Sequence, residues 1–156
     1  MKLRLIAVGT RMPAWVQEGY SEYATRMPRE CRLELVEIAV APRGKNADLG
    51  RLRHAEGEKM QKAIPRDTPV IAFDERGELL SSTQWAGALG KWLQDGRDVA
   101  LLIGGPDGFA PALLERADRR WSLSKLTLPH GLARVLVAEQ LYRAWSLLHN
   151  HPYHRA

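Results

Sequence analysis

Two adjacent glycines directly follow a strand-like run of apolar residues. The run is VALLI at 99–103, and Gly104-Gly105-Pro106-Asp107-Gly108 comes next. Because glycine has no Cβ, the backbone N–H groups of such a loop can approach a ligand closely. Ligands of open parallel sheets bind just beyond the carboxyl ends of the strands. The loop is therefore a candidate ligand site, although glycine and proline after a strand more often form only a turn.

The type of ligand is narrowed by the patterns that this loop lacks. Neither G-x-G-x-x-G nor a phosphate loop ending in Gly-Lys-Ser/Thr is present in the sequence. The G-x-S-x-G pattern of a nucleophilic serine is also absent. A ligand held by backbone amides and apolar walls is therefore favoured over one cradled by its phosphates.

The second group of polar residues follows the last predicted strand and continues into the C-terminal tail. His130 lies between Pro129 and Gly131, where loops often carry function, although it could equally begin a helix. In the tail, Tyr153 can stack on a base and Arg155 can pair with a phosphate. We therefore expect the tail to reach over an active site or an RNA backbone.

Two other polar groups have simpler interpretations. His149, His151 and His154 could bind a metal, but no carboxylate is near them in sequence, so we predict no metal site. Glu139 and Arg143 have the spacing of a helix-surface ion pair, and a catalytic role for Glu139 ranks second.

Alternating strand-like and helix-like segments must position these residues. Asp48 is a candidate helix cap, and Ser81 with Gln84 forms a capping-box pattern. Glu75-Arg76-Gly77-Glu78 is predicted to be a turn, and residues 42–46 a solvated connection rather than a phosphate contact. Strands are predicted at 2–9, 32–40, 68–74, 99–103 and 122–128, and helices at 13–27, 48–64, 81–93, 111–120 and 132–150. This alternation predicts an α/β fold, a mostly parallel sheet with helices on both faces, in one domain over residues 1–156.

The composition is that of one ordinary globular domain. The 156 residues are 45% hydrophobic and 26% charged, and no apolar stretch is long enough to cross a bilayer. With no signal peptide at the start, we expect a cytoplasmic location. The single cysteine, Cys31, excludes an internal disulfide and is expected to be a small buried residue before a strand. The net charge of +5 favours a polyanionic partner such as RNA, but only mildly.

The last predicted helix is apolar on nearly every side. One sheet face of a small domain cannot cover so much apolar surface, so a second copy of the chain is the expected partner.

Four segments together resemble the RlmH family, bacterial methyltransferases of large-subunit ribosomal RNA in the SPOUT superfamily. The resemblance covers essentially the whole chain, because it also includes Lys2-Leu3 and Arg43-Gly44-Lys45-Asn46-Ala47. The four segments are IGGPDG at 103–108, WSLSKLTLPH at 121–130, EQLYRAW at 139–145 and NHPYHR at 150–155.

The resemblance implies a C-terminal trefoil knot, a homodimer, S-adenosyl-L-methionine as methyl donor and no metal. The implied product is N3-methylpseudouridine in 23S ribosomal RNA, made on the assembled ribosome. Phe73 stands where the family has a leucine. The implied cofactor-binding positions are Phe73, Gly104, Leu123, Ser124, Lys125, Leu126, Thr127 and Leu128. We further hypothesise that His130, Tyr153 and Arg155 act in catalysis by orienting the base and its backbone.

Two other functions share part of this pattern. A flavodoxin-like module binding a flavin or another nucleotide has the same alternation, but leaves 122–130 and the tail unexplained. A non-enzymatic ribosome-associated RNA binder would use only the basic surface.

Overall fold

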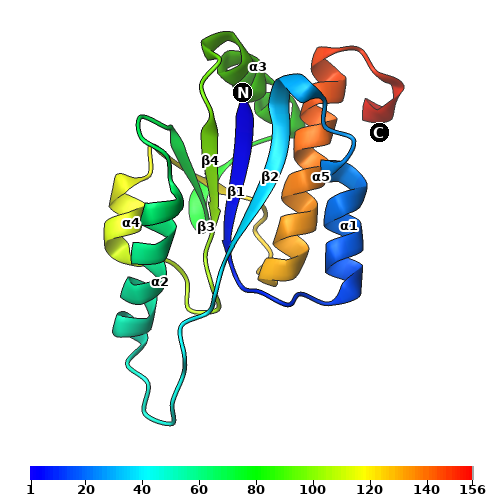
Figure 1. Cartoon of the computed structure of the whole chain (residues 1–156). Coiled ribbons are helices and arrows are strands. Elements are labelled where there is room, and N and C mark those ends of the chain that lie inside the picture. Colours follow the sequence, from blue (N-terminus) through cyan, green and yellow to red (C-terminus); the bar gives the residue numbers. More distant parts are fainter. Residues whose placement is uncertain (156) are drawn as a thin grey trace.

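All strands of the protein lie in one parallel sheet (Figure 1). The structure is a computed structural model that describes residues 1–155. The strand order is β2-β1-β4-β3-β5, so β2 and β5 are the edge strands. The strands are β1 (Lys2–Val8), β2 (Arg32–Ile38), β3 (Val70–Leu79), β4 (Val99–Ile103) and β5 (Arg119–Ser122).

Helices cover both faces of the sheet, as the alternation predicts. Figure 1 shows α2 and α4 on one side and α1 and α5 on the other, with α3 packed against α5. The helices are α1 (Ala14–Ala24), α2 (Leu49–Ala63), α3 (Ser82–Asp95), α4 (Pro111–Arg116) and α5 (His130–Leu148), with short 3₁₀ turns η1 (Arg29–Cys31) and η2 (Pro152–His154). This order of β4, β5 and α5 is consistent with the implied knot.

The core has two parts, one under each helical layer. Alternate residues of β1 and β4 point to opposite faces, as they must in a pleated strand. Leu5 and Leu101 therefore contact the α1, α3 and α5 side, whereas Ile6 and Leu102 contact the α2 and α4 side. The central strand β4 is buried along its whole length, which explains its unbroken apolar run.

Local signals placed several helix starts correctly. The Asp48 side chain accepts hydrogen bonds from the N–H groups of Gly50 and Arg51, and Ser81 with Gln84 forms the complete capping box. Cys31 is fully buried just before β2, and burial raises the pKa of its thiol to about 12.

The predicted strand at 122–128 is wrong, because β5 ends at Ser122 and the following residues form a loop. The Ser122 hydroxyl donates to the Ser124 carbonyl, and the Leu126 N–H donates to the Ser124 hydroxyl. Such local side-chain bonds compete with strand pairing. The true strand begins at Arg119, so the helix predicted at 111–120 ends early, at Arg116.

The turn predicted at 75–78 is also wrong, because β3 continues through it with a register shift between Phe73 and Glu78. Gly77 permits this pairing: a Cβ there would lie 2.6 Å from the Arg120 carbonyl oxygen. Within residues 1–155, no helix is long and apolar enough to span a membrane.

Candidate active site

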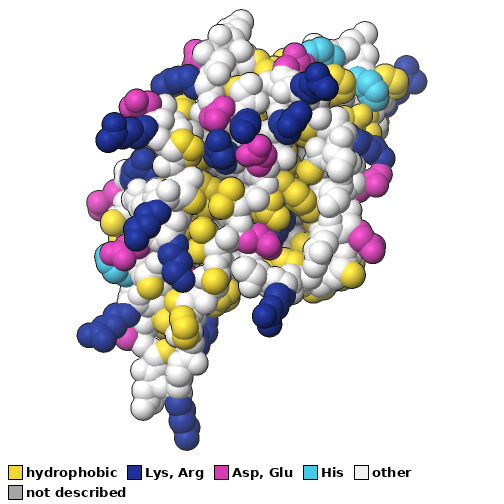
Figure 2. Space-filling view, viewed as in Figure 1, with side chains coloured by type: hydrophobic (Ala, Val, Ile, Leu, Met, Phe, Trp, Pro, Cys, Tyr) yellow, Lys and Arg dark blue, Asp and Glu magenta, His cyan; other side chains and the backbone are white. Residues whose placement is uncertain are grey.

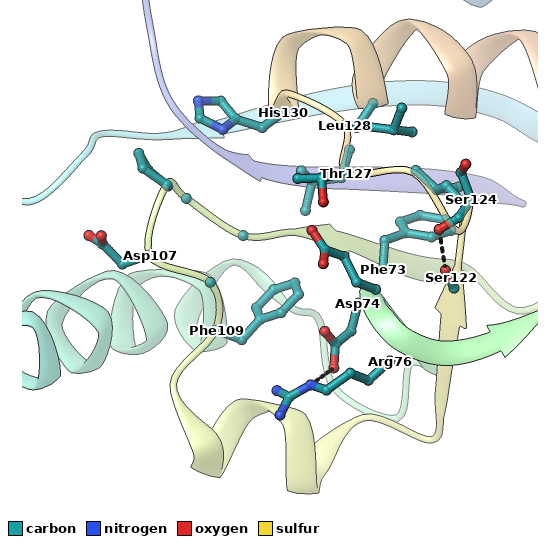
Figure 3. Close-up of a pocket in the computed structure, with 18 of the residues that line it drawn as sticks. Phe73, Asp74, Arg76, Asp107, Phe109, Ser122, Ser124, Thr127, Leu128 and His130 are labelled. Atoms are coloured by element: carbon teal, nitrogen blue, oxygen red, sulfur yellow. Dashed lines mark hydrogen bonds and ion pairs between the residues drawn. The ribbon is translucent and has the colours of Figure 1, made fainter.

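A cavity of about 420 Å³ opens at the carboxyl end of β4, beside the middle of β3, where the pairing of these two strands ends. That volume is within the range of small-molecule sites. Figure 3 shows that its walls come from the middle of β3, the loop after β4, the loop after β5 and the start of α5. These segments are distant in sequence and meet only because parallel strands place their carboxyl ends at one edge.

The loop after β4, hereafter the glycine loop (residues 104–108), presents bare backbone to this cavity. It is closed by a hydrogen bond from the Gly108 N–H to the Gly105 carbonyl, and Gly108 has a left-handed φ of +80°. A Cβ on Gly104 would lie 3.2 Å from the Gly108 carbonyl carbon, so the loop is compact because side chains are absent. The glycine loop is therefore shaped to bring main chain close to a ligand, as expected.

The loop after β5, hereafter the serine loop (residues 123–129), forms the opposite wall. Ser122 is buried and anchors the loop through its bond to the Ser124 carbonyl, which Figure 3 draws. The loop contributes an apolar wall from Leu123 and Leu128. Phe73, the last residue of β3 that pairs with β4, adds an aromatic surface that stacks on Trp85 at a ring-centroid distance of 5.7 Å.

Most of the residues predicted for this site do line the cavity. Lys125 is the exception: it is exposed and is not among the described residues that line the cavity. The predicted residues that line the cavity are Phe73, Gly104, Leu123, Ser124, Leu126, Thr127, Leu128 and His130.

His130 is the first residue of α5 and lies at the rim of the cavity in Figure 3. The preceding Pro129 is the N-cap and supplies no side-chain cap. His130 therefore begins a helix and also lines the cavity, and its role in the reaction stays a prediction.

Tyr153 and Arg155 do not share this cavity within one chain. The tail folds back on α5 near its C-terminal end, at the opposite end of the molecule in Figure 1. The Tyr153 ring lies 4.7 Å from the Tyr142 ring, and its hydroxyl donates to Glu139 at 2.9 Å. Glu139 is nine residues beyond His130, roughly 14 Å along the helix. Within one chain these tail residues lie away from the cavity, so their expected place beside it requires a second subunit and stays a prediction.

The ion pair predicted between Glu139 and Arg143 is confirmed, with Arg143 Nη2 2.7 Å from Glu139 Oε1. This hydrogen bond raises the pKa of the Arg143 guanidinium. Burial, the Tyr23 hydroxyl and the Glu139 carboxylate raise the pKa of Tyr153, so its phenol keeps its proton at neutral pH. The tail is therefore attached to its own α5 through Glu139.

Sequence reasoning missed several polar residues at the cavity. Asp74 follows Phe73 at the cavity, and its Oδ2 lies 3.8 Å from Nε of Arg76 (Figure 3). Its position just after a buried strand was an available signal, but the expectation of a turn at 75–78 hid it. Arg53 of α2 also lines the cavity, which no local pattern indicates.

The three tail histidines do not form a cluster with other ligands. Within residues 1–155 no group of three His, Cys, Asp or Glu side chains is placed to hold a metal ion.

Fold and cavity define the class: an α/β protein with a parallel sheet and a cavity where ligands of such sheets bind, beyond the carboxyl end of a central strand. The chain belongs to the SPOUT methyltransferase family, since the family described as "Predicted SPOUT methyltransferase" matches residues 1–154.

Relatives and solved structures agree with this assignment. The chain is 56% identical over 155 residues to "Ribosomal RNA large subunit methyltransferase H" of Thioalkalivibrio sulfidiphilus, covering 99% of each protein. It is 54% identical over 155 residues to the protein of the same name from Marinomonas sp., covering 99% of this chain and 100% of that one.

Two solved structures show the same fold. One is a protein assigned to a methylase family from Neisseria gonorrhoeae (TM-score 0.56, 14% identity, 90% of this chain and 81% of that one). The other, named as a methyltransferase, is from Bordetella pertussis Tohama I (TM-score 0.58, 20% identity, 91% and 95%).

Proposed function

We propose that this protein methylates large-subunit ribosomal RNA, transferring a methyl group from S-adenosyl-L-methionine to N3 of a pseudouridine in the 23S RNA of the assembled ribosome. The observation that carries the proposal is the cavity between the glycine loop and the serine loop, in a chain more than half identical to proteins named as large-subunit ribosomal RNA methyltransferases. A ribosomal substrate keeps the expected location cytoplasmic.

The residues of the cavity fit this methyl donor. An adenosine needs apolar surface for its base and backbone groups for its polar edge, which Phe73, Leu128 and the bare main chain of Gly104 offer. When bound, S-adenosyl-L-methionine supplies a methyl group activated by a sulfonium. The substitution of leucine by Phe73 keeps an apolar wall.

The chain's own contribution to the reaction is positioning and proton handling. Methyl transfer requires in-line approach of the accepting nitrogen, so correct orientation carries much of the catalysis. The N3–H of a pseudouridine must also lose its proton. His130 at the cavity rim is placed to orient the base or to assist that loss.

Tyr153 and Arg155 take part in this proposal through a second subunit. Within one chain they lie at the far end of α5, so they reach a cavity only if two chains pack with their α5 helices antiparallel. The proposed enzyme is therefore a homodimer in which the tail of one subunit covers the cavity of the other.

The test is alanine substitution at His130, Tyr153 and Arg155, each assayed on ribosomes and on free large subunits. Each variant should lose most of its methylation rate and still bind S-adenosyl-L-methionine in calorimetry. Full activity in all three variants would reject the assigned roles.

Two controls separate the alternative functions. Calorimetric binding of FMN in place of the methyl donor would support a flavodoxin-like module. Unchanged 23S RNA masses in a deletion strain would support a binder without enzymatic activity.

A further inference from the structure

The connection between β2 and α2 is a basic projection at the same edge of the sheet as the cavity. We call residues 39–48 the basic arm; it contains Arg43 and Lys45, and the first turn of α2 adds Arg51. In Figure 1 the arm extends beyond the rest of the molecule at the carboxyl ends of the strands. Figure 2 shows the same projection with Lys and Arg side chains at its tip and along its flank.

The arm is attached to the cavity and is more than a solvated connection. The Arg43 guanidinium pairs with Asp107 of the glycine loop, and its Nη2 lies 3.8 Å from Glu56 Oε2. Glu56 is only 2% exposed and accepts a hydrogen bond from the Ala41 N–H at 3.0 Å. The base of the arm is thus fixed to the loop that lines the site.

The cations beyond this anchor have no acidic partners. Within residues 1–155, Lys45, Arg51 and Arg53 form no ion pair within 4 Å, unlike Arg43. Arg53 also lines the cavity, and its Nε is buried without a hydrogen-bond partner among the described residues. Arg76 at the same rim is paired with Asp74, and Glu75 and Asp107 also line the cavity, so the unpaired positive charge is that of Lys45, Arg51 and Arg53.

The position of Arg51 is unfavourable for the helix itself. It lies in the first turn of α2, which contains no acidic residue, and a cation there opposes the helix dipole. The Asp48 carboxylate caps this helix start, and the exposed Arg51 side chain has no ion-pair partner among the described residues, so its charge is available to an external anion.

We propose that the basic arm and the first turn of α2 bind the phosphate backbone of the ribosomal RNA next to the methylated nucleotide. This inference rests on the proposed function, and it adds a contact made by the same subunit that holds the methyl donor. An RNA strand is favoured over an acidic protein because the charges are spaced along a narrow projection. The base of this projection is fixed to the glycine loop, which lines the proposed methyl-donor cavity. Exposed lysine and arginine are the usual partners of phosphates.

The test compares two variants, each with two positive side chains changed to negative ones, at opposite ends of α2. The test variant is Lys45→Glu with Arg51→Glu. The control is Lys59→Glu with Lys62→Glu, which makes the same charge change on exposed residues toward the other end of α2. Ribosome binding is measured by filter retention over a series of salt concentrations, and methylation and donor binding are measured separately.

The test variant should bind ribosomes about tenfold more weakly, with a salt dependence shallower by about 1 to 2 in log-log slope. The methylation KM for ribosomes should rise while kcat and donor affinity stay within about twofold of the parent protein. The charge-conserving variant Lys45→Arg with Arg51→Lys should bind ribosomes as the parent protein does, because phosphate contacts need charge more than shape.

Three outcomes would overturn the proposal: an unchanged salt slope, an equal loss in the control, or lost donor binding in the test variant. Unchanged ribosome affinity with lost binding of poly-glutamate would point to an acidic protein partner instead. Because filter retention needs no turnover, failure of the proposed methylation remains distinguishable from failure of this contact.

Discussion

Arg134 is the residue whose environment differs most from its sequence context. It is 1% exposed in the second turn of α5, although arginine side chains are almost never fully buried unless paired. Its Nη1 lies 2.7 Å from Glu37 Oε2, and its Nη2 donates to the Gly9 carbonyl at 2.6 Å. The side chain therefore joins α5 to the carboxyl ends of β1 and β2, next to the elements that form the cavity.

Replacing Arg134 with Met should lower the free energy of unfolding by about 3 kcal/mol, because Glu37 and the Gly9 carbonyl lose their partner. Glu37→Gln, which keeps an acceptor oxygen, should cost less than about 1 kcal/mol. Urea unfolding followed by circular dichroism measures both. Equal stability of Arg134→Met and the parent protein would mean that the pair contributes nothing.

At the scale of elements, the glycine loop is held against the sheet by close contacts. A Cβ on Gly105 would lie 2.9 Å from Val8 Cγ1 and 3.1 Å from Glu56 Oε1. Val8 ends β1 and Glu56 belongs to α2, so the position of the loop depends on both neighbours.

Gly105→Ala should displace the glycine loop and weaken S-adenosyl-L-methionine binding by about tenfold or more, a change of at least ~1.4 kcal/mol in binding free energy. Calorimetry with the methyl donor gives this number directly. Gly87→Ala is the matched control, because Gly87 is exposed on α3 and a Cβ there would meet nothing within 4 Å. Affinity for the methyl donor should stay unchanged in this variant, while the free energy of unfolding rises by up to about 1 kcal/mol. Parent-like affinity in Gly105→Ala would show that the loop tolerates a side chain.

At the scale of the whole molecule, α1 and α5 leave apolar surface uncovered. Trp15 is 56% exposed and Leu132 is 38% exposed. The two helices are in close contact at their N-terminal halves, since a Cβ on Gly131 would lie 3.1 Å from Val16. The core covers much of α5, as its buried residues show, and the remainder is the surface that the proposed homodimer would use.

Trp15→Glu should therefore shift the protein from dimer to monomer in sedimentation velocity, because a buried carboxylate would be unpaired at the interface. The methylation rate of this variant should fall as the dimer is lost, and its affinity for S-adenosyl-L-methionine should persist. Leu79→Glu changes an exposed apolar residue at the end of β3 and should leave the dimer intact. A monomeric parent protein, or a dimeric Trp15→Glu, would contradict the assigned surface.

The sequence was informative where the signal is local or periodic. The buried run at 99–103 and the caps at Asp48 and Ser81 follow from a few neighbouring residues, and each is confirmed. The glycine loop does line a cavity, while its role as a ligand site stays a prediction. The strand predicted at 122–128 failed because its alternating leucines and serines imitate a strand, whereas the serine hydroxyls bond to their own backbone.

By itself, the sequence determined the alternating elements, the parallel sheet and the glycine loop, because hydrophobic period, capping residues and glycine act over a few positions. Only the tertiary structure decided which charges meet: Arg43 with Asp107, Arg134 with Glu37, and Tyr153 with its own Glu139 rather than with the cavity. These pairs join residues 14 to 97 positions apart. Their contacts depend on the order of the strands in the sheet and on the packing of the helices, and no local sequence pattern encodes either.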